Sequence, residues 1–265
     1  MQFRNGQGFW VKAWRRRLIL RAPSFGYHDS HKSVRRPSIS IVLALGKPFK
    51  VYHHFSIPIL SYGLFIGPHV LRDRIEAVDS DLMVFDVTTG CPEFTDLLSI
   101  AKVGEVVQMT SQQYEMLVSL CHAYPEASSA ERLFEAVINT LCSVRSQSIV
   151  QDKRLASALR MVEERSLDEC SVADLARQSG LSISWMRAMF EREMFCSPSY
   201  YMRMAALWKV LPLIEQGLSF TDAAHAVGFH DLSHFHRAVT EFTGYSPTYS
   251  KFFYATEAMS LLDRV

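Results

Sequence analysis

The chain has 265 residues, of which 48% are hydrophobic and 21% are charged, and its formal net charge at pH 7 is +1. This is the composition of an ordinary soluble globular protein, and a usual domain size of about 100 to 200 residues predicts two domains. No apolar run approaches the about 18 residues that a membrane span requires, so we expect no signal peptide, no membrane partner and a cytoplasmic location.

The cysteines and N-terminal histidines form no disulfide or metal pattern. The cysteines are odd in number, widely spaced and without a CxxC pair, which predicts reduced thiols at Cys91, Cys121, Cys142, Cys170 and Cys196. An iron or manganese site would need two histidines and a carboxylate. No HxH with a following glutamate occurs, so we expect no metal, no cofactor and no catalytic residue among His28, His31, His53, His54 and His69.

Residues 1–37 are basic and show no regular pattern, and the run Arg15–Arg17 is expected to form a solvated surface. From Ser38 onward, β-rich runs alternate with Gly/Pro turns, at Ser38–Leu45, Phe49–Phe55, Ile57–Ile66 and Leu82–Thr88. Evenly spaced short strands of this kind predict a β-sandwich or a small barrel.

Residues 111–145 have helical spacing instead. A first helix is expected to begin at Ser111 and end before Pro125, with a stripe formed by Tyr114, Leu117, Val118 and Cys121. A second begins at Ser128 or Ser129, with a stripe formed by Leu133, Val137, Ile138 and Leu141. Such an αα-hairpin could cap the core of the β-rich part. The polar segment Ser143–Asp152 is expected to be a linker, followed by a helix with Leu155, Leu159 and Val162 on its core side.

One short pattern occurs twice between Ser171 and Pro247. It recurs at an offset of 48, with Ser171, Asp174, Ala176 and Gly180 matching Ser219, Asp222, Ala224 and Gly228. After the glycine the offset is 49, as in Met186 and Phe235, Phe190 and Val239, and Ser197-Pro198 and Ser246-Pro247. In each copy a serine can cap one helix, a glycine can end it, and another helix begins shortly afterwards, at Ser182 or about Asp231. The pattern predicts two helix-turn-helix units, whose second helices enter the DNA major groove.

These residues resemble the DNA-binding domain of the bacterial AraC-type (AraC/XylS) transcription regulators. The resemblance covers roughly residues 152–254 and includes Gly228-Phe229, Ser233, Phe235, Arg237 and Gly244-Tyr245-Ser246-Pro247. In the N-terminal half, His31 and Phe65–His69 look similar to the cupin-like sensor barrel of such regulators.

The resemblance implies an α+β protein of two domains. A cupin-like sensor and dimerisation domain would span residues 1–145, with a β-barrel at about 20–110 and the helical hairpin at 111–145. A linker at 146–152 would precede an all-α DNA-binding domain at 153–254, in which a long helix joins the two units, and a tail at 255–265. In the family the hairpin commonly makes the dimer contact, and this alternative to a capping role stays open.

The resemblance also indicates which residues contact DNA. Helical spacing turns Met186, Met189 and Phe190 inward in the first unit, and Phe235, Ala238 and Val239 in the second. The candidate DNA-binding residues lie on the other sides or at the start of these helices: Ser182, Ser184, Trp185, Arg187, Ala188, Ser233, His234, His236 and Arg237.

Arg187 is the strongest candidate, because its guanidinium can bond guanine O6 and N7 together. Trp185 is expected mainly to pack, and the histidines mainly to be solvated. Asp231 is expected to cap the second reading helix.

The charge balance differs between the two halves of the chain. Residues 1–150 contain 16 Lys and Arg against 13 Asp and Glu, and residues 151–265 contain 12 against 14. The DNA-binding half therefore lacks a basic footprint, so we expect a modest, salt-sensitive affinity.

The chain departs from the family pattern at Phe195, Ala206, Val210 and Ser250, where the family has Gly, Arg, Ala and Tyr. Pro212 also lies inside the joining helix, where it removes a hydrogen bond. We expect that helix to continue through Pro212 with a bend, which puts the relative placement of the two units in question.

The leading hypothesis is a sequence-specific DNA-binding transcriptional regulator whose N-terminal domain senses an effector, dimerises, or does both. Its expected partners are double-stranded DNA and a second copy of the chain, with RNA polymerase and a small-molecule effector as further candidates. Two alternatives remain, a regulator controlled by a protein partner and a cupin-type metal enzyme fused to a DNA-binding domain.

Overall fold

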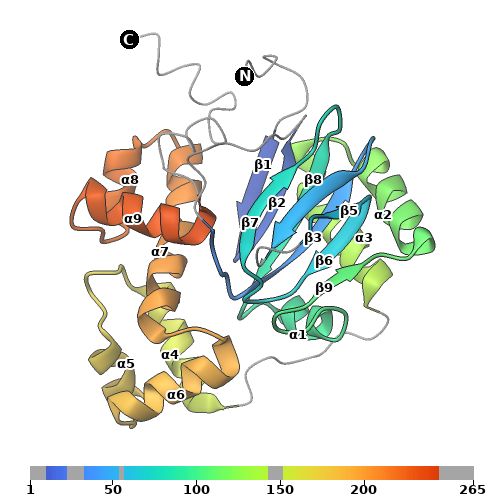
Figure 1. Cartoon of the computed structure of the whole chain (residues 1–265). Coiled ribbons are helices and arrows are strands. Elements are labelled where there is room, and N and C mark those ends of the chain that lie inside the picture. The colour runs from blue at the N-terminus through green and yellow to red at the C-terminus, as the bar shows by residue number, and fades with distance from the viewer. Residues whose placement is uncertain (1–9, 23–32, 54–56, 143–151, 245–265) are drawn as a thin grey trace.

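The computed structural model describes residues 10–22, 33–53, 57–142 and 152–244 (Figure 1). The N-terminal domain consists of two β-sheets and a few helices, and the C-terminal domain is built of helices alone. The predicted two-domain α+β organisation is therefore confirmed. The histidines at 28, 31 and 54, most of the linker at 146–152, Ser246-Pro247, Ser250 and the tail at 255–265 lie outside the described residues.

The larger sheet has six antiparallel strands. Their spatial order is β1 (Trp10–Trp14), β2 (Arg17–Ala22), β8 (Leu82–Thr88), β3 (Ser38–Ala44), β6 (Gly63–Ile66) and β9 (Val106–Gln108). The smaller sheet contains β5 (Ile59–Ser61), β4 (Phe49–His53) and β7 (Arg72–Glu76), in that order. The predicted β-rich runs form strands, but the run Ile57–Ile66 is divided into β5 and β6 at Tyr62.

The predicted cupin-like barrel is wrong for the described residues, because the two sheets remain open. The six-stranded sheet ends at β1 on one side and at β9 on the other, and these strands do not pair. The smaller sheet instead packs face to face on part of the larger one, with Val42, Phe49, Val51 and Leu64 buried between them. Since both faces of the large sheet are covered by other elements, closure into a barrel is not required to bury its apolar residues.

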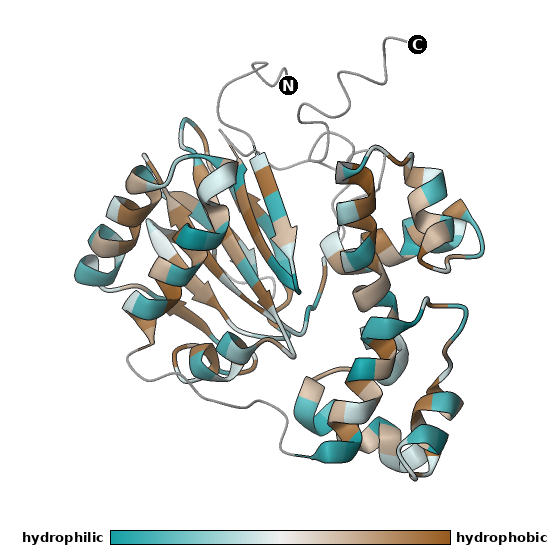
Figure 2. Ribbon diagram, turned by 180° about the vertical axis from the view of Figure 1, so that it is seen from behind, coloured by the Kyte–Doolittle hydropathy of each residue, from teal (hydrophilic) through white to brown (hydrophobic). Residues whose placement is uncertain are grey.

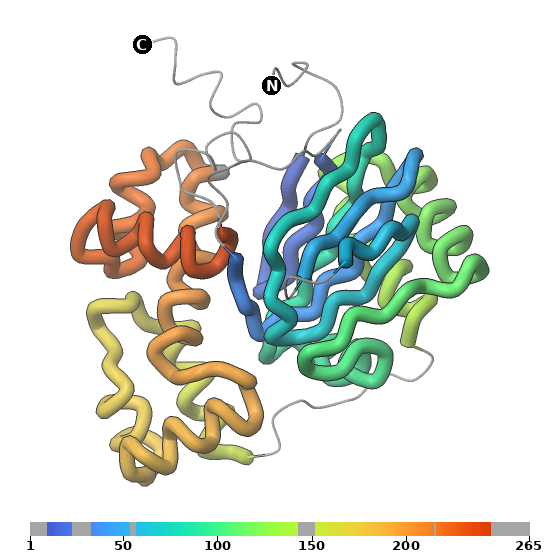
Figure 3. Tube along the Cα trace, in the orientation of Figure 1, coloured from blue at the N-terminus to red at the C-terminus, as the bar shows by residue number. Residues whose placement is uncertain are grey.

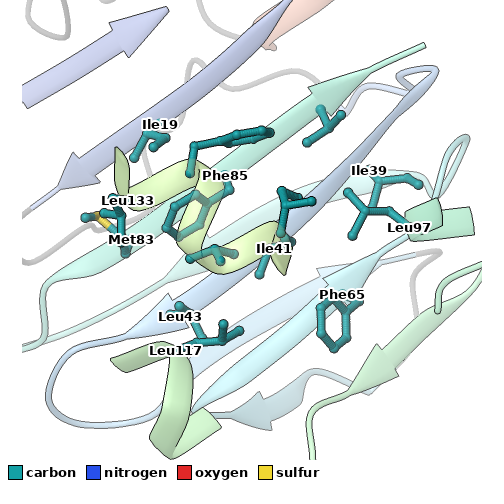
Figure 4. Packing of buried hydrophobic residues seen from close by; sticks show 14 of the residues in the cluster. Ile19, Ile39, Ile41, Leu43, Phe65, Met83, Phe85, Leu97, Leu117 and Leu133 are labelled. Carbon is teal, nitrogen blue, oxygen red and sulfur yellow. The ribbon is translucent and has the colours of Figure 1, made fainter. Parts of the chain in front are cut away.

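The other face of the large sheet is covered by helices. These are α1 (Pro92–Leu98), α2 (Ser111–Ala123), a short 3-10 turn (Ala127–Ser129) and α3 (Ala130–Leu141). Ile41 and Phe85 of the strands meet Leu117 of α2 and Leu133 of α3 in one core (Figure 4). Figure 2 shows hydrophobic residues concentrated on the strands and hydrophilic residues on the outer sides of these helices. No helix in the described ranges is both long and apolar enough to cross a membrane.

The αα-hairpin predicted at 111–145 is present, and its apolar stripes are buried against its own domain. Leu117 and Cys121 of α2 and Val137 and Ile138 of α3 all lie in the core with the sheet. The hairpin therefore caps the N-terminal core, which was one of the two alternatives. The homodimer stays a prediction, and any contact through the hairpin has to use its outer residues.

Arg15 and Arg16 form the turn between β1 and β2, and Arg17 begins β2; Arg15 is exposed, but the predicted solvated surface is wrong for Arg16 and Arg17. Arg15 and Arg16 have positive φ angles of 40° and 67°. The Arg16 and Arg17 side chains are only 20% and 13% exposed. Arg17 donates to both carboxylate oxygens of Glu93, at 3.0 and 2.9 Å. The Arg16 and Arg17 guanidinium groups lie inside the protein and each meets an acidic or hydroxyl partner, which is the condition for burying a guanidinium.

The C-terminal domain contains six helices within the described residues. They are α4 (Lys153–Glu164), α5 (Val172–Gln178), α6 (Ile183–Met194), α7 (Pro198–Glu215), α8 (Phe220–Ala226) and α9 (Leu232–Thr243). Helices α5 and α6 form the first helix-turn-helix unit, α8 and α9 form the second, and α7 joins them. The predicted serine caps are confirmed, because Ser171, Ser182, Ser197 and Ser219 each accept a backbone N–H of the following helix. Gly180 and Gly228 have φ angles of 65° and 91°, as the turn pattern predicted.

Helix α7 continues through Pro212, as predicted. Because proline has no N–H, the carbonyl of Trp208 lacks its usual helical partner at that point. The size of any bend there stays a prediction.

The buried hairpin provides a stability test. Leu133 has no exposed surface and lies between α3 and the sheet, whereas Met116 of α2 is 47% exposed. We expect Leu133→Ala to lower the free energy of unfolding by about 2–5 kcal/mol, because it removes buried methyl groups and leaves a cavity. Met116→Ala is the matched control and should change it by no more than about 0.5 kcal/mol. Urea denaturation followed by circular dichroism measures both, and equal small effects would show that the hairpin is not part of the core.

Candidate DNA-reading faces and interdomain cavity

The second helix of the first unit, α6, presents a polar face to solvent. Met186, Met189 and Phe190 are buried as predicted. Ser184, Arg187 and Ala188 are exposed on the opposite side. The Ser182 hydroxyl accepts the N–H of Trp185 at 3.2 Å, so this hydroxyl caps the helix. Arg187 is thus on an exposed face of a capped helix, where a base contact is sterically allowed.

Trp185 does not pack, contrary to expectation. It is 59% exposed, and the neighbouring Ile183 is 42% exposed. The inward side of α6 is already filled by the two methionines and Phe190, so the indole has no core to enter. An exposed tryptophan at the start of a reading helix adds apolar surface that can contact a sugar or a thymine methyl group.

The second helix of the second unit, α9, is arranged in the same way. Its cap is Asp231, whose carboxylate accepts the N–H of His234 at 2.6 Å. Ser233, His236 and Arg237 are exposed. His234 is half-buried, with its ring 5.1 Å from that of Phe229. Burial, followed by the positive charge of Arg237, lowers the pKa of His234, which favours its neutral form.

The N-terminal domain contacts the C-terminal domain away from the exposed residues of α6 and α9. The Arg16 guanidinium bonds the Tyr201 hydroxyl of α7 and lies 3.2 Å from Glu163 of α4. The His69 Nε2 lies 2.5 Å from the carbonyl oxygen of Phe195, at the end of α6. These contacts leave Arg187 of α6 and Arg237 of α9 exposed to solvent.

Phe195 explains one departure from the family pattern. It has a φ angle of 56°, in the left-handed region where glycine is usual. Its ring centroid lies 5.7 Å from that of Phe94, and the side chain packs against the N-terminal core. The phenylalanine therefore gives up glycine's conformational freedom, at a cost of about 1–2 kcal/mol, and gains an aromatic contact between the domains.

A cavity of about 210 Å³ lies between the two domains, beside β1, β2 and β8. Its walls are mostly apolar. The N-terminal domain contributes Val11, Leu18, Leu20, Leu82 and Val84. The C-terminal domain contributes Leu207, Trp208, Leu211 and Ile214 of α7 and Phe235, Val239 and Phe242 of α9. Figure 1 shows α7 and α9 on the side of the sheet where β1 and β2 lie.

Two arginines and one aspartate form the polar end of this cavity. Asp86 of β8 is 4% exposed and lies 3.5 Å from Arg72 and 3.8 Å from Arg36. The Ser38 hydroxyl donates to Asp86 at 3.1 Å, and the Ser40 hydroxyl also donates to it. Burial alone would raise the pKa of Asp86, but Arg36, Arg72 and the two serines outweigh it and lower the pKa. Asp86 is therefore ionised, and two guanidinium groups share its single charge.

The cluster has more hydrogen-bond donors than acceptors. The Nε atoms of Arg36 and Arg72 are buried without a hydrogen-bond partner among the described residues. The same holds for the Tyr200 hydroxyl and the Trp208 Nε1 of α7. Burial, followed by the like charge of Arg36, lowers the pKa of Arg72 to about 9, so its guanidinium remains charged at pH 7. Unpaired buried donors of this kind are costly, and an anion would satisfy them.

The sequence patterns found the reading helices but missed this cluster. One available signal was Asp86 itself, a charged residue within the apolar run Leu82–Val87.

The cysteines form no disulfide in the structure, because Cys91, Cys121, Cys142, Cys170 and Cys196 are free. In the described part of the chain no three His, Cys, Asp or Glu side chains are grouped so that they could hold a metal ion.

Two helix-turn-helix units joined by one long helix define a class of DNA-binding protein, and comparisons with known proteins agree. A model of a helix-turn-helix domain matches residues 175–250. A protein named probable transcriptional regulator LumQ, from Photobacterium leiognathi, is 25% identical, with 77% of this chain and 93% of LumQ covered.

Among solved structures, the fold is similar to that of ToxT from Vibrio cholerae. An apo form of a ToxT variant superposes with a TM-score of 0.60 at 9% identity, over 91% of this chain and 99% of that one. Wild-type ToxT bound to an unsaturated fatty acid gives a TM-score of 0.56 at 9% identity, over 97% and 98%. The C-terminal domain is an AraC-type helix-turn-helix domain, and the chain is a DNA-binding transcriptional regulator.

The exposed position of Arg187 leads to a test of base reading. We expect Arg187→Ala to weaken binding to a specific duplex by about 1–3 kcal/mol and to relax the choice at one base pair, because a bidentate base contact is lost. Fluorescence anisotropy with a duplex selected by the wild-type protein, and with its single-base-pair variants, measures both effects.

The matched control is Arg177→Ala, which removes the same charge from α5, where Arg177 is ion-paired with Asp174. It should weaken binding to all duplexes about equally, and by less than Arg187→Ala weakens binding to the selected duplex. A loss for Arg187→Ala that is equal on selected and random DNA would mean that Arg187 contacts only phosphate.

Proposed function

We propose that this regulator reads DNA with both helix-turn-helix units and that an anionic amphiphile, bound in the interdomain cavity, controls this reading. The observation that carries the proposal is the pair of Arg36 and Arg72 around Asp86, at the end of an apolar cavity. The apolar walls suit a hydrocarbon body, and the surplus guanidinium charge suits a carboxylate.

The ligands of similar folds support this class of effector. ToxT structures include one bound to an unsaturated fatty acid and one bound to (E)-4-(8-methylnaphthalen-1-yl)but-3-enoic acid. Both ligands join one carboxyl group to an apolar body. The same chemistry fits the cavity of this chain, where the head group would meet arginines and the body would lie along α7 and β2.

The DNA-reading half of the proposal rests on the exposed residues of the two units. In the first unit Arg187 would read a base, with Ser184, Trp185 and Ala188 beside it and Ser182 at the helix start. In the second unit Ser233, His234, His236 and Arg237 would contact bases or phosphates. We also propose, from the family resemblance, a homodimer that contacts RNA polymerase and acts on DNA in the bacterial cytoplasm.

The position of the cavity suggests how a ligand would influence DNA binding. The walls that the C-terminal domain contributes are the second half of α7 and the core side of α9. Helix α9 is the candidate reading helix of the second unit. The N-terminal domain is held at a separate place to the end of α6, through His69 and Phe195, and to α4 and the start of α7, through Arg16. A bound ligand would therefore change the restraint on the second unit relative to the first. Such a change affects DNA affinity only if the ligand binds one placement of the second unit more tightly than another.

The head-group assignment can be tested with a matched pair of ligands. We expect the wild-type protein to bind oleate at least about tenfold more tightly than oleyl alcohol, because a buried charge-assisted hydrogen bond is worth about 1.5–3 kcal/mol. Arg72→Met should remove most of this difference, since it deletes the buried guanidinium and keeps an apolar side chain. Titration calorimetry below the micellar concentration gives the affinities.

Lys50→Met is the control, because Lys50 is exposed on β4 and its removal changes the net charge equally. Oleate should also change the affinity of the wild-type protein for its selected duplex and leave that of Arg72→Met unchanged. Equal binding of oleate and the alcohol by the wild-type protein would contradict the anion site. Tight oleate binding with an unaltered DNA affinity would contradict its regulatory role.

A further inference from the structure

Lys209 of α7 makes an unusual contact with the end of another helix. Its ammonium group donates to the carbonyl oxygens of Val162 and Arg165, at 2.7 and 2.6 Å. These carbonyls lie at the C-terminal end of α4, where helical carbonyls lack partners and a positive charge is favourable. Burial lowers the pKa of Lys209, which is consistent with an amine held inside the domain. Lys209 therefore fixes the end of α4 to the middle of α7.

The segment that follows α4 touches the second unit directly. The N–H of Leu167 donates to the carbonyl of Val227 at 2.9 Å. The Leu167 side chain packs against the cores of both units. Gly228 lies so close that a Cβ atom there would be 2.3 Å from the Asp168 carboxylate and 2.7 Å from the Leu167 nitrogen. The two units are thus joined by this contact as well as by α7.

Between Lys209 and the second unit, the joining helix α7 contains a residue that weakens its hydrogen bonding. Pro212 follows Lys209 by three residues and removes a hydrogen bond from α7 before the second unit begins. Figure 3 shows α7 running from the lower unit to the upper one, so any flexing at Pro212 would change the direction of the second reading helix. A second connection between the units limits that flexing.

We propose that Lys209 is a positioning residue that sets the separation and orientation of the two DNA-reading helices. By holding the end of α4, it keeps residues 165–168 against the turn at Val227 and Gly228. The inference rests on the proposed reading of DNA by both units, because only then does their separation affect affinity. Two reading helices must lie about 34 Å apart to enter successive major grooves on one face of DNA.

The test measures the dependence of affinity on the spacing of the DNA segments. The probe is a duplex that the wild-type protein selects from a random-sequence pool and protects at two segments. Derivatives carry one to five base pairs inserted between the segments, and another has one segment scrambled. We expect Lys209→Met to bind the selected duplex at least about tenfold more weakly, because two-point binding is lost when the geometry is not held. Its spacing profile, which is the affinity as a function of the number of inserted base pairs, should also be flatter than that of the wild type. It should bind the scrambled duplex as the wild type does.

Three further variants separate positioning from general damage. Lys209→Arg should restore the sharp spacing profile, since a guanidinium can also donate to the two carbonyls. Lys153→Met removes the same charge from an exposed position at the start of α4 and should leave the profile unchanged. Gly228→Ala perturbs the same contact from the second unit and should flatten the profile with Lys209 intact. Thermal unfolding of each variant establishes that the domain is folded.

The outcomes distinguish this inference from the proposed function. A wild-type protein that protects a single segment would overturn the reading by two units, and the inference with it. If the wild type protects two segments and Lys209→Met keeps a sharp profile, the positioning role is wrong and the two-unit function stands. An equal loss by Lys209→Met on the intact and scrambled duplexes would also overturn it, because it would show general damage or lost charge.

Discussion

The burial of one carboxylate in the middle of the large sheet constrains much of the N-terminal domain. Strand β8 is covered on both faces, with Phe85 directed toward the helices and Val84 and Asp86 toward the cavity. An ionised carboxylate is tolerated in such a place only when it is paired and hydrogen-bonded. Arg36 and Arg72 provide that pairing, and they come from two different segments. The charge of Asp86 thus helps to hold residues 33–37 and strand β7 at the edge of the cavity.

The same pairing leaves the cavity with an excess of positive charge. Two guanidinium groups face one carboxylate, and several of their N–H groups are buried without acceptors among the described residues. Each unmade hydrogen bond of this kind costs about 1–3 kcal/mol. From the other domain, Trp208 lines the cavity, and its Nε1 is also buried without a hydrogen-bond partner among the described residues.

The N-terminal domain contacts both helix-turn-helix units and leaves both reading faces exposed. His69 contacts the end of α6 in the first unit, and the cavity walls include α9 of the second unit and the joining helix α7. Arg16 lies 3.2 Å from Glu163, close to the end of α4 that Lys209 holds. Among the described residues, Arg187 of α6 and Arg237 of α9 stay exposed while the opposite sides of these helices are buried.

The sequence by itself determined the local structure of the C-terminal domain and the class of protein. Caps such as Ser182, turn glycines such as Gly180 and the inward spacing of Met186 act over a few residues, so a repeated pattern was enough to define both units. Tertiary structure alone decided that Arg16 is buried, that Trp185 is exposed and that the sheets do not close into a barrel. It also decided that Arg36, Arg72 and Asp86 meet beside α7. These features depend on which segments lie against each other, and periodicity along one segment does not contain that information.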